Sequence, residues 1–367
     1  MRPRVLLVGN YSPDNQYSMR GLHQCLHRGL LDRGDSVGSI EPRRFFGNRG
    51  PAGKYRAYVD KYVLFPRQLR AAAQKYDVVH VVDQGNAMYL ESCRQIPSLL
   101  TCHDLLPLSA SLGEIPEWEV GPSGKVLQQW IKRSIGLATV VACVSKFTLS
   151  ELRRLVPNAP HSAELVYNGF YSPKVELAEQ ESLSALASLK LEPGYLFHIG
   201  GNSRYKNKAG LVEIFAALAQ RPGFESARLV MAGHRPTEDL LAHVASLGIS
   251  EKIKVVGEVS EEQLASLYTH AGALLFPSLM EGFGLPVIEA MRYGCPVFAS
   301  NRPPLPEIGG DAARFFDPKE PTQAADVIVD GWSEREAMQE AGAQNAARFE
   351  TEVMIEKYRD LYQRLCS

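Results

Sequence analysis

Short runs of β-branched and other apolar residues alternate along the whole chain with longer stretches in which apolar residues recur at helical spacing. This alternation is typical of strand-helix units that form parallel sheets. In the first half the runs predict strands at residues 4–8, 78–82, 98–102, 139–144 and 164–167. In the second half they predict strands at residues 195–199, 227–232, 253–256, 273–276 and 296–299. Since about five strands suffice for a doubly wound domain, we expect an α/β protein with two Rossmann-like domains facing each other across a cleft.

The domain boundary is expected in the polar stretch 172–191, which lies between the two sets of strands and is predicted to be a linker off the sheets. The pattern therefore divides the chain into domains at residues 1–172 and 173–349. Residues 334–366 have the apolar spacing of a helix, and we expect the final segment, about 350–367, to pack back on the first domain.

Composition adds an asymmetry to this picture. With 367 residues, 45% hydrophobic and 22% charged, the chain has the composition of a globular protein, and general disorder is excluded. The net charge of −1 conceals 21 Lys and Arg against 14 Asp and Glu in residues 1–170, and 19 against 27 in the remainder. A basic half joined to an acidic half indicates a surface that meets an anionic partner.

Segments that would place the protein in a membrane or an oxidising compartment are not found in the sequence. The amino end lacks a signal-peptide core, and no run of about 18 apolar residues occurs. The six cysteines are scattered without metal-ligand spacing, so we expect reduced, mostly buried thiols. The prediction is a cytoplasmic protein that is soluble or peripheral to a membrane.

The most informative stretch is residues 273–300, where a predicted buried strand, a glycine-rich turn and a helix at about 285–293 follow one another. Such a turn directs the backbone N–H groups of Phe283, Gly284 and Leu285 from a helix amino terminus, a geometry that binds phosphate. Gly282 and Gly284 would allow close approach of the backbone.

Two glutamates flank this turn, Glu281 before it and Glu289 on the helix. A carboxylate near a diphosphate is repelled unless hydroxyl groups donate to it, so Glu289 suits a ribose and Glu281 suits the hydroxyls of a sugar. The alternative is that Glu281 is a helix-cap acid and Glu289 a solvated helix residue.

The stretch EGFGLPVIEA, Glu281–Ala290, resembles the carboxylate motif of glycosyltransferase family 4, the retaining GT-B enzymes that use nucleotide-diphosphate sugars. The resemblance implies that Glu281 contacts the donor sugar, that Glu289 holds the ribose hydroxyls, and that the amides of Phe283, Gly284 and Leu285 bind the diphosphate.

A second stretch, HIGGNSRYKNKAGL at residues 198–211, also resembles the family. Gly200 and Gly201 end a strand, and Lys206 with the following Asn matches the family's Lys-Asn, which implies a cation that neutralises the departing diphosphate. The family's Arg position is occupied by Gly201, and Arg204 is the substitute. The alternative for Arg204, Lys206 and Lys208 is a solvated basic loop.

Several residues of the first half match the family less sharply. His103, just past a strand, is implied to line the donor-sugar pocket. The loop and helix start at residues 6–22 are expected to face the donor and acceptor. For every one of these positions the alternative is a structural residue, a cap or a turn. The expected acceptor-site or cleft residues are Asn10, Gln16, Tyr17, Ser18, Asp104, Ser145 and Asn168.

The chain contains no Asp-x-Asp, the usual ligand set of a metal-bridged diphosphate, so we expect neither a metal nor another cofactor. The resemblance implies a retaining transferase that passes a hexose from a nucleotide-diphosphate sugar to a lipid-linked oligosaccharide or surface polysaccharide. Mannose from GDP-mannose is preferred, with UDP-glucose or another UDP-sugar as the alternative. A non-catalytic GT-B scaffold that binds a nucleotide sugar is the alternative of another class.

The excess of positive charge is concentrated in residues 42–75, where nine Lys and Arg accompany a single acid, Asp60, with interleaved aromatic and aliphatic residues. On a helix, this combination fits an anionic membrane surface. A solvated helix face is the alternative. Nucleic acid is disfavoured because no nucleic-acid-binding module accompanies the patch. We expect a peripheral location on the inner face of the plasma membrane.

Overall fold

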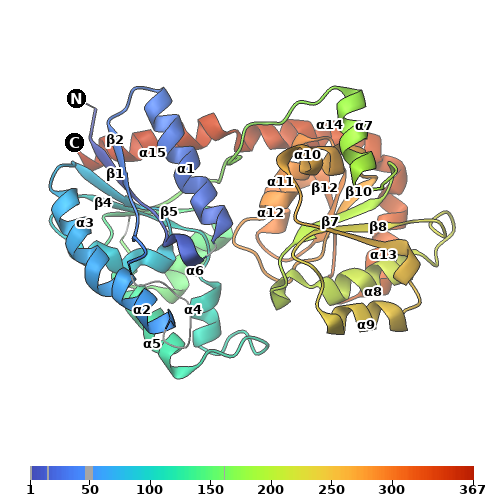
Figure 1. The fold of residues 1–367 in the computed structure, drawn as a ribbon, viewed down its shortest axis with the longest axis horizontal. Coiled ribbons are helices and arrows are strands. Elements are labelled where there is room, and N and C mark those ends of the chain that lie inside the picture. Colours follow the sequence, from blue (N-terminus) through green and yellow to red (C-terminus); the bar gives the residue numbers. More distant parts are fainter. Residues whose placement is uncertain (1, 15, 46–52, 161) are drawn as a thin grey trace. The chain divides into compact units, whose positions relative to one another are not determined.

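The computed structural model describes residues 2–14, 16–45, 53–160 and 162–367 (Figure 1). The chain divides into two compact units. Unit 1 comprises Met1–Ser172 and Glu350–Ser367, and unit 2 comprises Pro173–Phe349. Each unit contains a six-stranded parallel sheet with helices, so the predicted fold class is confirmed.

The sheet of unit 1 has the strand order β2-β1-β3-β4-β5-β6. Its inner strands read as continuous apolar runs because helices cover both faces of a parallel sheet, and β1, β3, β4 and β5 are buried along their whole length. The strands are β1 (Val5–Val8), β2 (Val37–Ile40), β3 (Val78–Val81), β4 (Ser98–Cys102), β5 (Val140–Cys143) and β6 (Ala163–Leu165).

The helices of unit 1 bury their apolar sides in two clusters built on the two sets of alternating strand residues. The α-helices are α1 (Tyr17–Asp32), α2 (Gly53–Val59), α3 (Phe65–Ala73), α4 (Leu106–Ser111), α5 (Pro122–Ile135), α6 (Lys146–Leu155) and α15 (Thr351–Leu365). Shorter helical turns are η1 (Ser12–Asp14), the π-helix η2 (Asp60–Leu64) and η3 (Gln84–Ser92).

The final helix, α15, belongs to unit 1 because buried polar contacts fix it to the sheet. His80 on β3 is fully buried, and its Nδ1 and Nε2 atoms lie 2.7 Å from the Tyr362 hydroxyl and 2.8 Å from the Thr101 hydroxyl. The Thr101 hydroxyl also lies 2.9 Å from that of Tyr358. Burial lowers the pKa of His80 to about 3, so this ring is neutral at pH 7.

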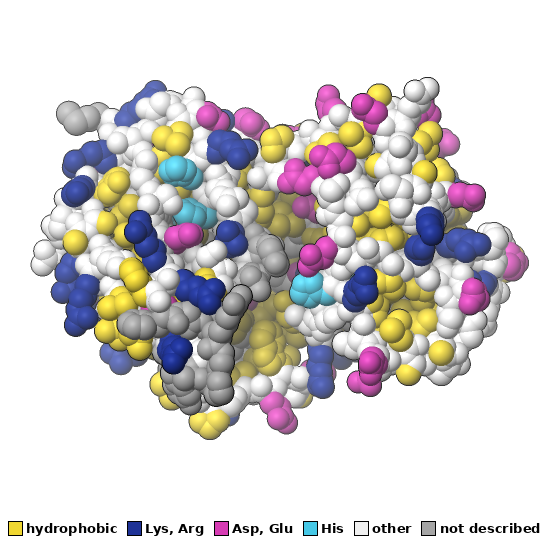
Figure 2. All heavy atoms as spheres, in the orientation of Figure 1, with side chains coloured by type: hydrophobic (Ala, Val, Ile, Leu, Met, Phe, Trp, Pro, Cys, Tyr) yellow, Lys and Arg dark blue, Asp and Glu magenta, His cyan; other side chains and the backbone are white. Residues whose placement is uncertain are grey.

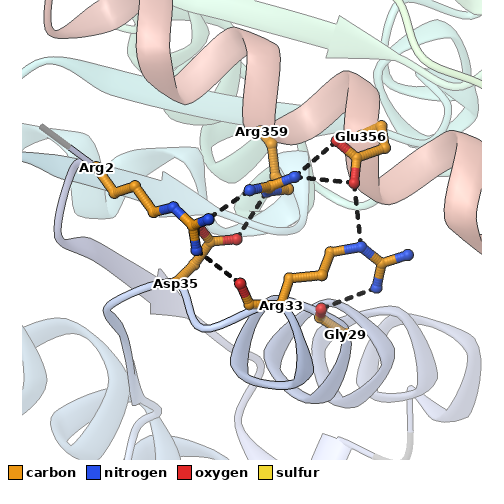
Figure 3. Close-up of polar contacts among 6 residues, drawn as sticks. All are labelled: Arg2, Gly29, Arg33, Asp35, Glu356 and Arg359. Atoms are coloured by element: carbon orange, nitrogen blue, oxygen red, sulfur yellow. Dashed lines mark hydrogen bonds and ion pairs between the residues drawn. The ribbon is translucent and has the colours of Figure 1, made fainter.

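A charged cluster continues the attachment of α15 at the surface (Figure 3). Arg359 Nε donates to Asp35 Oδ2 at 2.7 Å, and Arg33 Nε donates to Glu356 Oε1 at 3.1 Å. Arg2 Nη1 donates to the carbonyl oxygen of Arg33 at 2.6 Å and lies 3.6 Å from Asp35. The amino-terminal segment, α1 and α15 are thereby joined, and both ends of the chain lie in unit 1 (Figure 1).

The sheet of unit 2 has the strand order β12-β11-β10-β7-β8-β9. Strand β10 occupies the centre beside β7, so both segments singled out in the sequence leave the sheet at neighbouring strand ends. The strands are β7 (Leu196–Gly200), β8 (Leu229–Gly233), β9 (Ile253–Gly257), β10 (Ala273–Phe276), β11 (Val297–Ser300) and β12 (Ala313–Phe316).

The helices of unit 2 cover this sheet, with a core that includes residues of β7, β8, β10 and α8. They are α7 (Glu179–Ser188), α8 (Lys208–Leu218), α9 (Glu238–Ser246), α10 (Glu261–His270), α11 (Leu285–Arg292), α12 (Leu305–Gly309), α13 (Pro321–Gly331) and α14 (Arg335–Ala346). Shorter turns are η4 (Arg204–Lys206), η5 (Ser250–Lys252), η6 (Gly310–Ala312), η7 (Trp332–Glu334) and η8 (Ala347–Phe349).

All ten predicted strands coincide with observed ones, and the two edge strands β2 and β12 are additional. Strand β2 contains a glycine and a serine and is half-exposed, so its sequence lacks the apolar run used for prediction. An added Cβ at Gly38 would lie 2.0 Å from the Tyr76 hydroxyl oxygen, so a larger residue there would displace the Tyr76 side chain.

The structure adds detail to two predicted segments. Residues 172–191, predicted to be a linker off the sheets, contain no strand but include helix α7, which packs against α10 through a hydrogen bond from Ser266 Oγ to the carbonyl oxygen of Ser182. Residues 334–366, predicted to be helical, are divided into α14, η8 and α15, because Glu350 adopts an extended conformation. The polar surface of α7 and the uniform apolar spacing across Glu350 gave no sign of these details in the sequence.

Surface and thiol properties follow the composition. Figure 2 shows mostly Lys and Arg on the viewed face of unit 1, and more Asp and Glu on that of unit 2. All six cysteines are free, and four of them are buried. Within the residues that the structure describes, no helix combines the length and apolar character needed to cross a membrane.

Candidate active site

The glycine-rich turn of unit 2 joins the end of β10 to α11. Gly284 is the N-cap of α11 and has a φ of 107°, a conformation that favours glycine. A Cβ at this position would also lie 2.7 Å from Leu305 Cδ2. Pro286 lies in the first turn of the helix, where its missing N–H removes no helical hydrogen bond. The sequence therefore starts a helix directly at the carboxyl edge of the sheet.

Glu281 and Lys206 form an ion pair at this edge. Lys206 Nζ lies 2.7 Å from Glu281 Oε1, and the side chains are only 19% and 9% exposed. The ammonium group also lies 5.5 Å from the centre of the Phe276 ring, where the π-electrons favour a cation. Low exposure strengthens the attraction between the charges, since less water screens them. The structure thus brings together two predicted catalytic residues that are 75 positions apart.

Asn207 holds the loop that carries Lys206. It adopts a left-handed conformation with a φ of 54° and caps α8 by accepting from Gly210 N. Its Nδ2 atom donates to the carbonyl oxygens of Pro277 and Pro318 at 3.0 and 3.1 Å. The Lys-Asn pair therefore consists of a cation and a residue that fastens its loop to the end of β10.

Glu289 is half-buried and hydrogen-bonded to a neighbouring helix, so it is not the freely solvated helix residue of the alternative interpretation. Burial raises the pKa of this carboxyl, while a hydrogen bond from the Tyr268 hydroxyl to Glu289 Oε2, 2.9 Å long, opposes the shift. Tyr268 in turn stacks on Tyr293 with ring centres 5.9 Å apart. The helix-cap interpretation of Glu281 was also wrong, because α11 has no side-chain cap.

The remaining predicted donor-site residues surround the same strand ends. Gly200 ends β7 and contacts Gly233, whose added Cβ would lie 2.8 Å from the Gly200 carbonyl oxygen. Gly201 follows directly, and Arg204 is exposed at the start of η4. Phe283 is buried, with its ring 5.6 Å from that of Phe349. Gly282 and Leu285 are partly exposed.

Lys208, a further cation of this loop, has a structural environment. It is 7% exposed, and its Nζ donates to Asn202 Oδ1 at 2.9 Å and to the carbonyl oxygen of His234 at 2.7 Å. Burial lowers the pKa of Lys208 to about 8. The basic character of the loop therefore serves two purposes, with Lys206 directed to Glu281 and Lys208 to the body of unit 2.

The carboxyl edge of the unit 1 sheet also gathers predicted site residues. Asn10, two residues after β1, donates through Nδ2 to Gln16 Oε1 and to Asp83 Oδ2. Asp83 follows β3 and also accepts from Gly85 N at 2.7 Å. Asn10 and Asp83 are 1% and 3% exposed. Asp83 was not predicted from the sequence, although it follows a predicted strand as His103 does.

His103 is held by neighbouring strand ends. Its Nε2 lies 2.9 Å from the carbonyl oxygen of Val82, which only accepts, so Nε2 carries the hydrogen. Its backbone N–H donates to Gln84 Oε1 at 2.8 Å. Burial lowers the pKa of His103, while the nearby Asp83 charge opposes the shift. The ring is therefore neutral at pH 7, and Nδ1 is an acceptor.

Other predicted residues of unit 1 have structural contacts at the same edge. Asp104 Oδ1 accepts from Leu106 N at 3.0 Å, and Ser145 caps α6 by accepting from Thr148 N at 3.0 Å. Thr148 Oγ1 donates to the carbonyl oxygen of His103, which connects this cap to β4. The last of these residues, Asn168, is 3% exposed.

One predicted residue on α1, Ser18, is exposed on the first turn and is not drawn into this arrangement. The side chain of another, Tyr17, lies outside the described residues. No signal in the sequence could have identified Tyr268 as the partner of Glu289, because it comes from the separate helix α10. Among the described residues, no group of three or more His, Cys, Asp or Glu could hold a metal ion.

Comparison with known proteins identifies both units. Residues 28–171 match the family model Glycosyltransferase Family 4, and residues 180–348 match Glycosyl transferases group 1. The chain is 31% identical over 266 residues to O-antigen chain mannosyltransferase B of Escherichia coli, a match that spans 70% of this chain and 66% of the relative. It is 40% identical over 96 residues to an MMP alpha-(1->4)-mannosyltransferase of Mycolicibacterium hassiacum, covering 25% of this chain and 23% of that relative.

Solved structures share the fold over nearly the whole chain. Sucrose-phosphate synthase from Thermosynechococcus elongatus has a TM-score of 0.74 at 20% identity and covers 99% of both chains. WaaG, a glycosyltransferase involved in lipopolysaccharide biosynthesis, has a TM-score of 0.73 at 13% identity, covering 98% of this chain and 99% of that one. With its family 4 domain followed by a group 1 domain on this fold, the chain belongs to the GT-B glycosyltransferases.

Proposed function

We propose that the chain transfers a hexose, mannose from GDP-mannose, to a lipid-linked oligosaccharide or surface polysaccharide with retention of configuration. The observation that carries this proposal is the ion pair of Lys206 and Glu281 beside the amino terminus of α11. The choice of mannose is supported by relatives named as mannosyltransferases. The choice of acceptor is supported by two relatives that are named O-antigen chain mannosyltransferases.

In this proposal different residues of unit 2 bind the sugar, the diphosphate and the ribose of the donor. Glu281 accepts from hydroxyls of the sugar, and the amide groups of the turn at Phe283–Leu285 bind the diphosphate. Glu289 accepts from the ribose hydroxyls, which would supply donors to a carboxylate whose burial disfavours its charge. The Tyr268 hydroxyl holds that carboxylate in one orientation.

The proposed chemistry places positive charge where the leaving group gains negative charge. Lys206, assisted by Arg204 and the positive end of the α11 dipole, stabilises the diphosphate as the glycosidic bond breaks. The acceptor hydroxyl then attacks the oxocarbenium-like centre from the side of the departing phosphate. The leaving phosphate oxygen takes the acceptor's proton, so the mechanism needs neither a metal ion nor a separate base.

A donor screen tests this proposal. We expect GDP-mannose to raise the melting temperature of the protein and UDP-glucose and ADP-glucose to have smaller effects, since binding to the native state at 100 times Kd adds about 2.7 kcal/mol. The shift should be lost in Glu289→Ala and retained in Glu258→Ala, an exposed control in the same unit. A larger shift with UDP-glucose would contradict the GDP-mannose assignment, and no shift with any sugar nucleotide would reject the donor site.

We also propose that residues 42–75 of unit 1, which include α2 and α3, contact an anionic membrane surface. Phe45, Val59 and Val63 are 56%, 39% and 46% exposed, and Arg56, Arg67 and Arg70 are exposed nearby in sequence. Exposed apolar groups can enter the interfacial layer while the cations meet lipid phosphates. Residues 46–52 and the side chains of Lys54 and Tyr55 lie outside the described residues.

Flotation with liposomes tests this surface. We expect the protein to float with phosphatidylglycerol-containing vesicles at low salt, and the variant Val59→Ser/Val63→Ser to remain in solution. The matched control Leu183→Ser/Leu241→Ser removes exposed apolar groups from unit 2, 39% and 48% exposed, and should float as the wild type does. Equal loss in both variants, or no flotation of the wild type at any salt concentration, would contradict the proposal.

A further inference from the structure

Asn10 combines full burial with an acceptor that has no partner. Its Nδ2 group contacts Gln16 Oε1 and Asp83 Oδ2, whereas its Oδ1 has no hydrogen-bond partner among the described residues. We infer that Asp83 is a positioning residue that turns the Asn10 amide so that Oδ1 accepts a hydrogen bond from a sugar hydroxyl. This inference rests on the proposed glycosyl transfer and assigns a role to a residue that the donor motif does not include.

The orientation of the amide follows from the chemistry of its partner. Both oxygens of an ionised carboxylate can only accept hydrogen bonds, so the amide group that faces Asp83 must be the NH₂. Asp83 is itself fixed, because its Oδ1 accepts from Gly85 N at 2.7 Å and its Oδ2 faces Asn10. The Asn10 carbonyl oxygen is therefore held on the opposite side of the amide, whichever way Gln16 is turned.

A buried acceptor without a hydrogen-bond partner destabilises the protein, because it has lost its hydration and gained no donor in exchange. Asn10 lies just past the carboxyl end of β1, at the edge where open α/β sheets bind their ligands. A ligand hydroxyl bound at this edge would donate a hydrogen bond to Asn10 Oδ1. Sites that bind a hydroxyl group commonly contain a buried polar group that is unpaired until the ligand binds.

The charge of Asp83 indicates which kind of ligand group donates the hydrogen bond to Asn10 Oδ1. The Asp83 carboxylate beside Asn10 would repel a phosphate, and an acceptor oxygen offers an anion nothing to bind. A neutral sugar hydroxyl donates without carrying charge. His103, on the same edge, contributes a second neutral acceptor at Nδ1. Two acceptors suit a polyhydroxylated ligand, which is either the sugar of the donor or the sugar of the acceptor.

The loop that carries Asn10 is also held independently of Asp83. The Tyr11 hydroxyl donates to Asp60 Oδ2 at 3.0 Å, and Lys61 Nζ donates to Asp14 Oδ2 at 2.7 Å. Substitution of Asp83 is therefore expected to turn the Asn10 amide and leave the loop in place.

The test exchanges the two side chains. In Asp83→Asn, Gly85 N still binds the Asn oxygen, so the new NH₂ faces the NH₂ of Asn10 and forces that amide to turn. In Asn10→Asp, two carboxylates face each other. Each single variant is expected to lose about 10- to 100-fold in kcat/KM. The double variant Asn10→Asp/Asp83→Asn restores a donor facing an acceptor and leaves an oxygen at the Oδ1 position, so it should recover at least tenfold over either single variant.

Kinetics are measured with the donor that the wild type uses, from GDP-mannose, UDP-glucose and ADP-glucose, and with octyl α-D-mannopyranoside as acceptor. If the single variants are impaired in transfer to the acceptor but hydrolyse the donor normally, the hydroxyl that binds Asn10 belongs to the acceptor sugar. If they lose the same factor in hydrolysis of the donor without acceptor, the hydroxyl belongs to the donor sugar. Asp32→Asn, an exposed control on α1, should leave all parameters unchanged.

Wild-type kinetics in Asp83→Asn, or a double variant no better than the single ones, would overturn the inference while the proposed function stands. A double variant that regains only the melting temperature, without kcat/KM, would show a purely structural pair and would also overturn it. Failure of the wild type to transfer or hydrolyse any of the three donors would reject the proposed function and the inference with it.

Discussion

Replacement of Glu281 by alanine is expected to reduce sugar transfer by about 10²- to 10³-fold, the largest effect of any single substitution in unit 2. The carboxylate is 9% exposed and lies 2.7 Å from Lys206, so its removal eliminates the proposed sugar contact and leaves the ammonium group without this partner. Both consequences act on the geometry in which the diphosphate leaves. Initial rates with the donor selected by thermal shift measure the effect.

The control for Glu281 is Glu258→Ala, which removes an exposed carboxylate from the same unit and should retain the wild-type rate. Glu281→Gln keeps the shape of the side chain but not the charge, and should lie between the alanine variant and the wild type. A properly folded Glu281→Ala protein that transfers sugar at the normal rate would show that this residue has no part in the reaction.

Replacement of Lys206 by methionine is expected to lower kcat by about 10²-fold with a smaller change in the KM for the donor. The negative charge on the diphosphate grows as the glycosidic bond breaks, so a cation at this position stabilises the transition state more than the bound substrate. Methionine retains most of the apolar stem that packs beside Phe276, which limits the structural disturbance. Steady-state kinetics separate the two parameters.

Lys254→Met, an exposed lysine on β9, is the matched control and should leave both parameters unchanged. The double variant Glu281→Ala/Lys206→Met should lose less than the product of the single losses, because the two side chains act as an ion pair. If Lys206→Met raised KM and left kcat intact, the lysine would serve donor binding alone, and its proposed role in leaving-group departure would be wrong.

The strands could be predicted because a parallel sheet buried on both faces selects continuous apolar runs, as in β10 and β4. Edge strand β2 was not predicted because it is half-exposed and because it contains Gly38, which has no side chain and lies against Tyr76. The start of α11 could be predicted because Gly284 and Pro286 have backbone preferences that act locally.

The site could be predicted only where its chemistry lies within one continuous segment. Glu281 and Glu289 flank one turn, so their spacing identifies the motif, but the sequence did not decide between a fully solvated Glu289 and one that is half-buried. The environment of Glu289 depends on Tyr268, which lies on the separate helix α10. Asp83 was missed for the same reason, since its significance depends on Asn10, 73 residues away in the chain.

By itself, therefore, the sequence determined the class of fold, the position of the glycine-rich turn and the residue types from which we propose a nucleotide-sugar site. These follow from local backbone preferences and from the periodicity of burial. Only the tertiary structure decided that Lys206 pairs with Glu281, that Lys208 and Asn207 have structural roles, and that Asp83 accepts a hydrogen bond from Asn10. Such contacts depend on which strand ends become neighbours, because hydrogen bonds and ion pairs act over a few ångströms in space and carry no trace in local spacing.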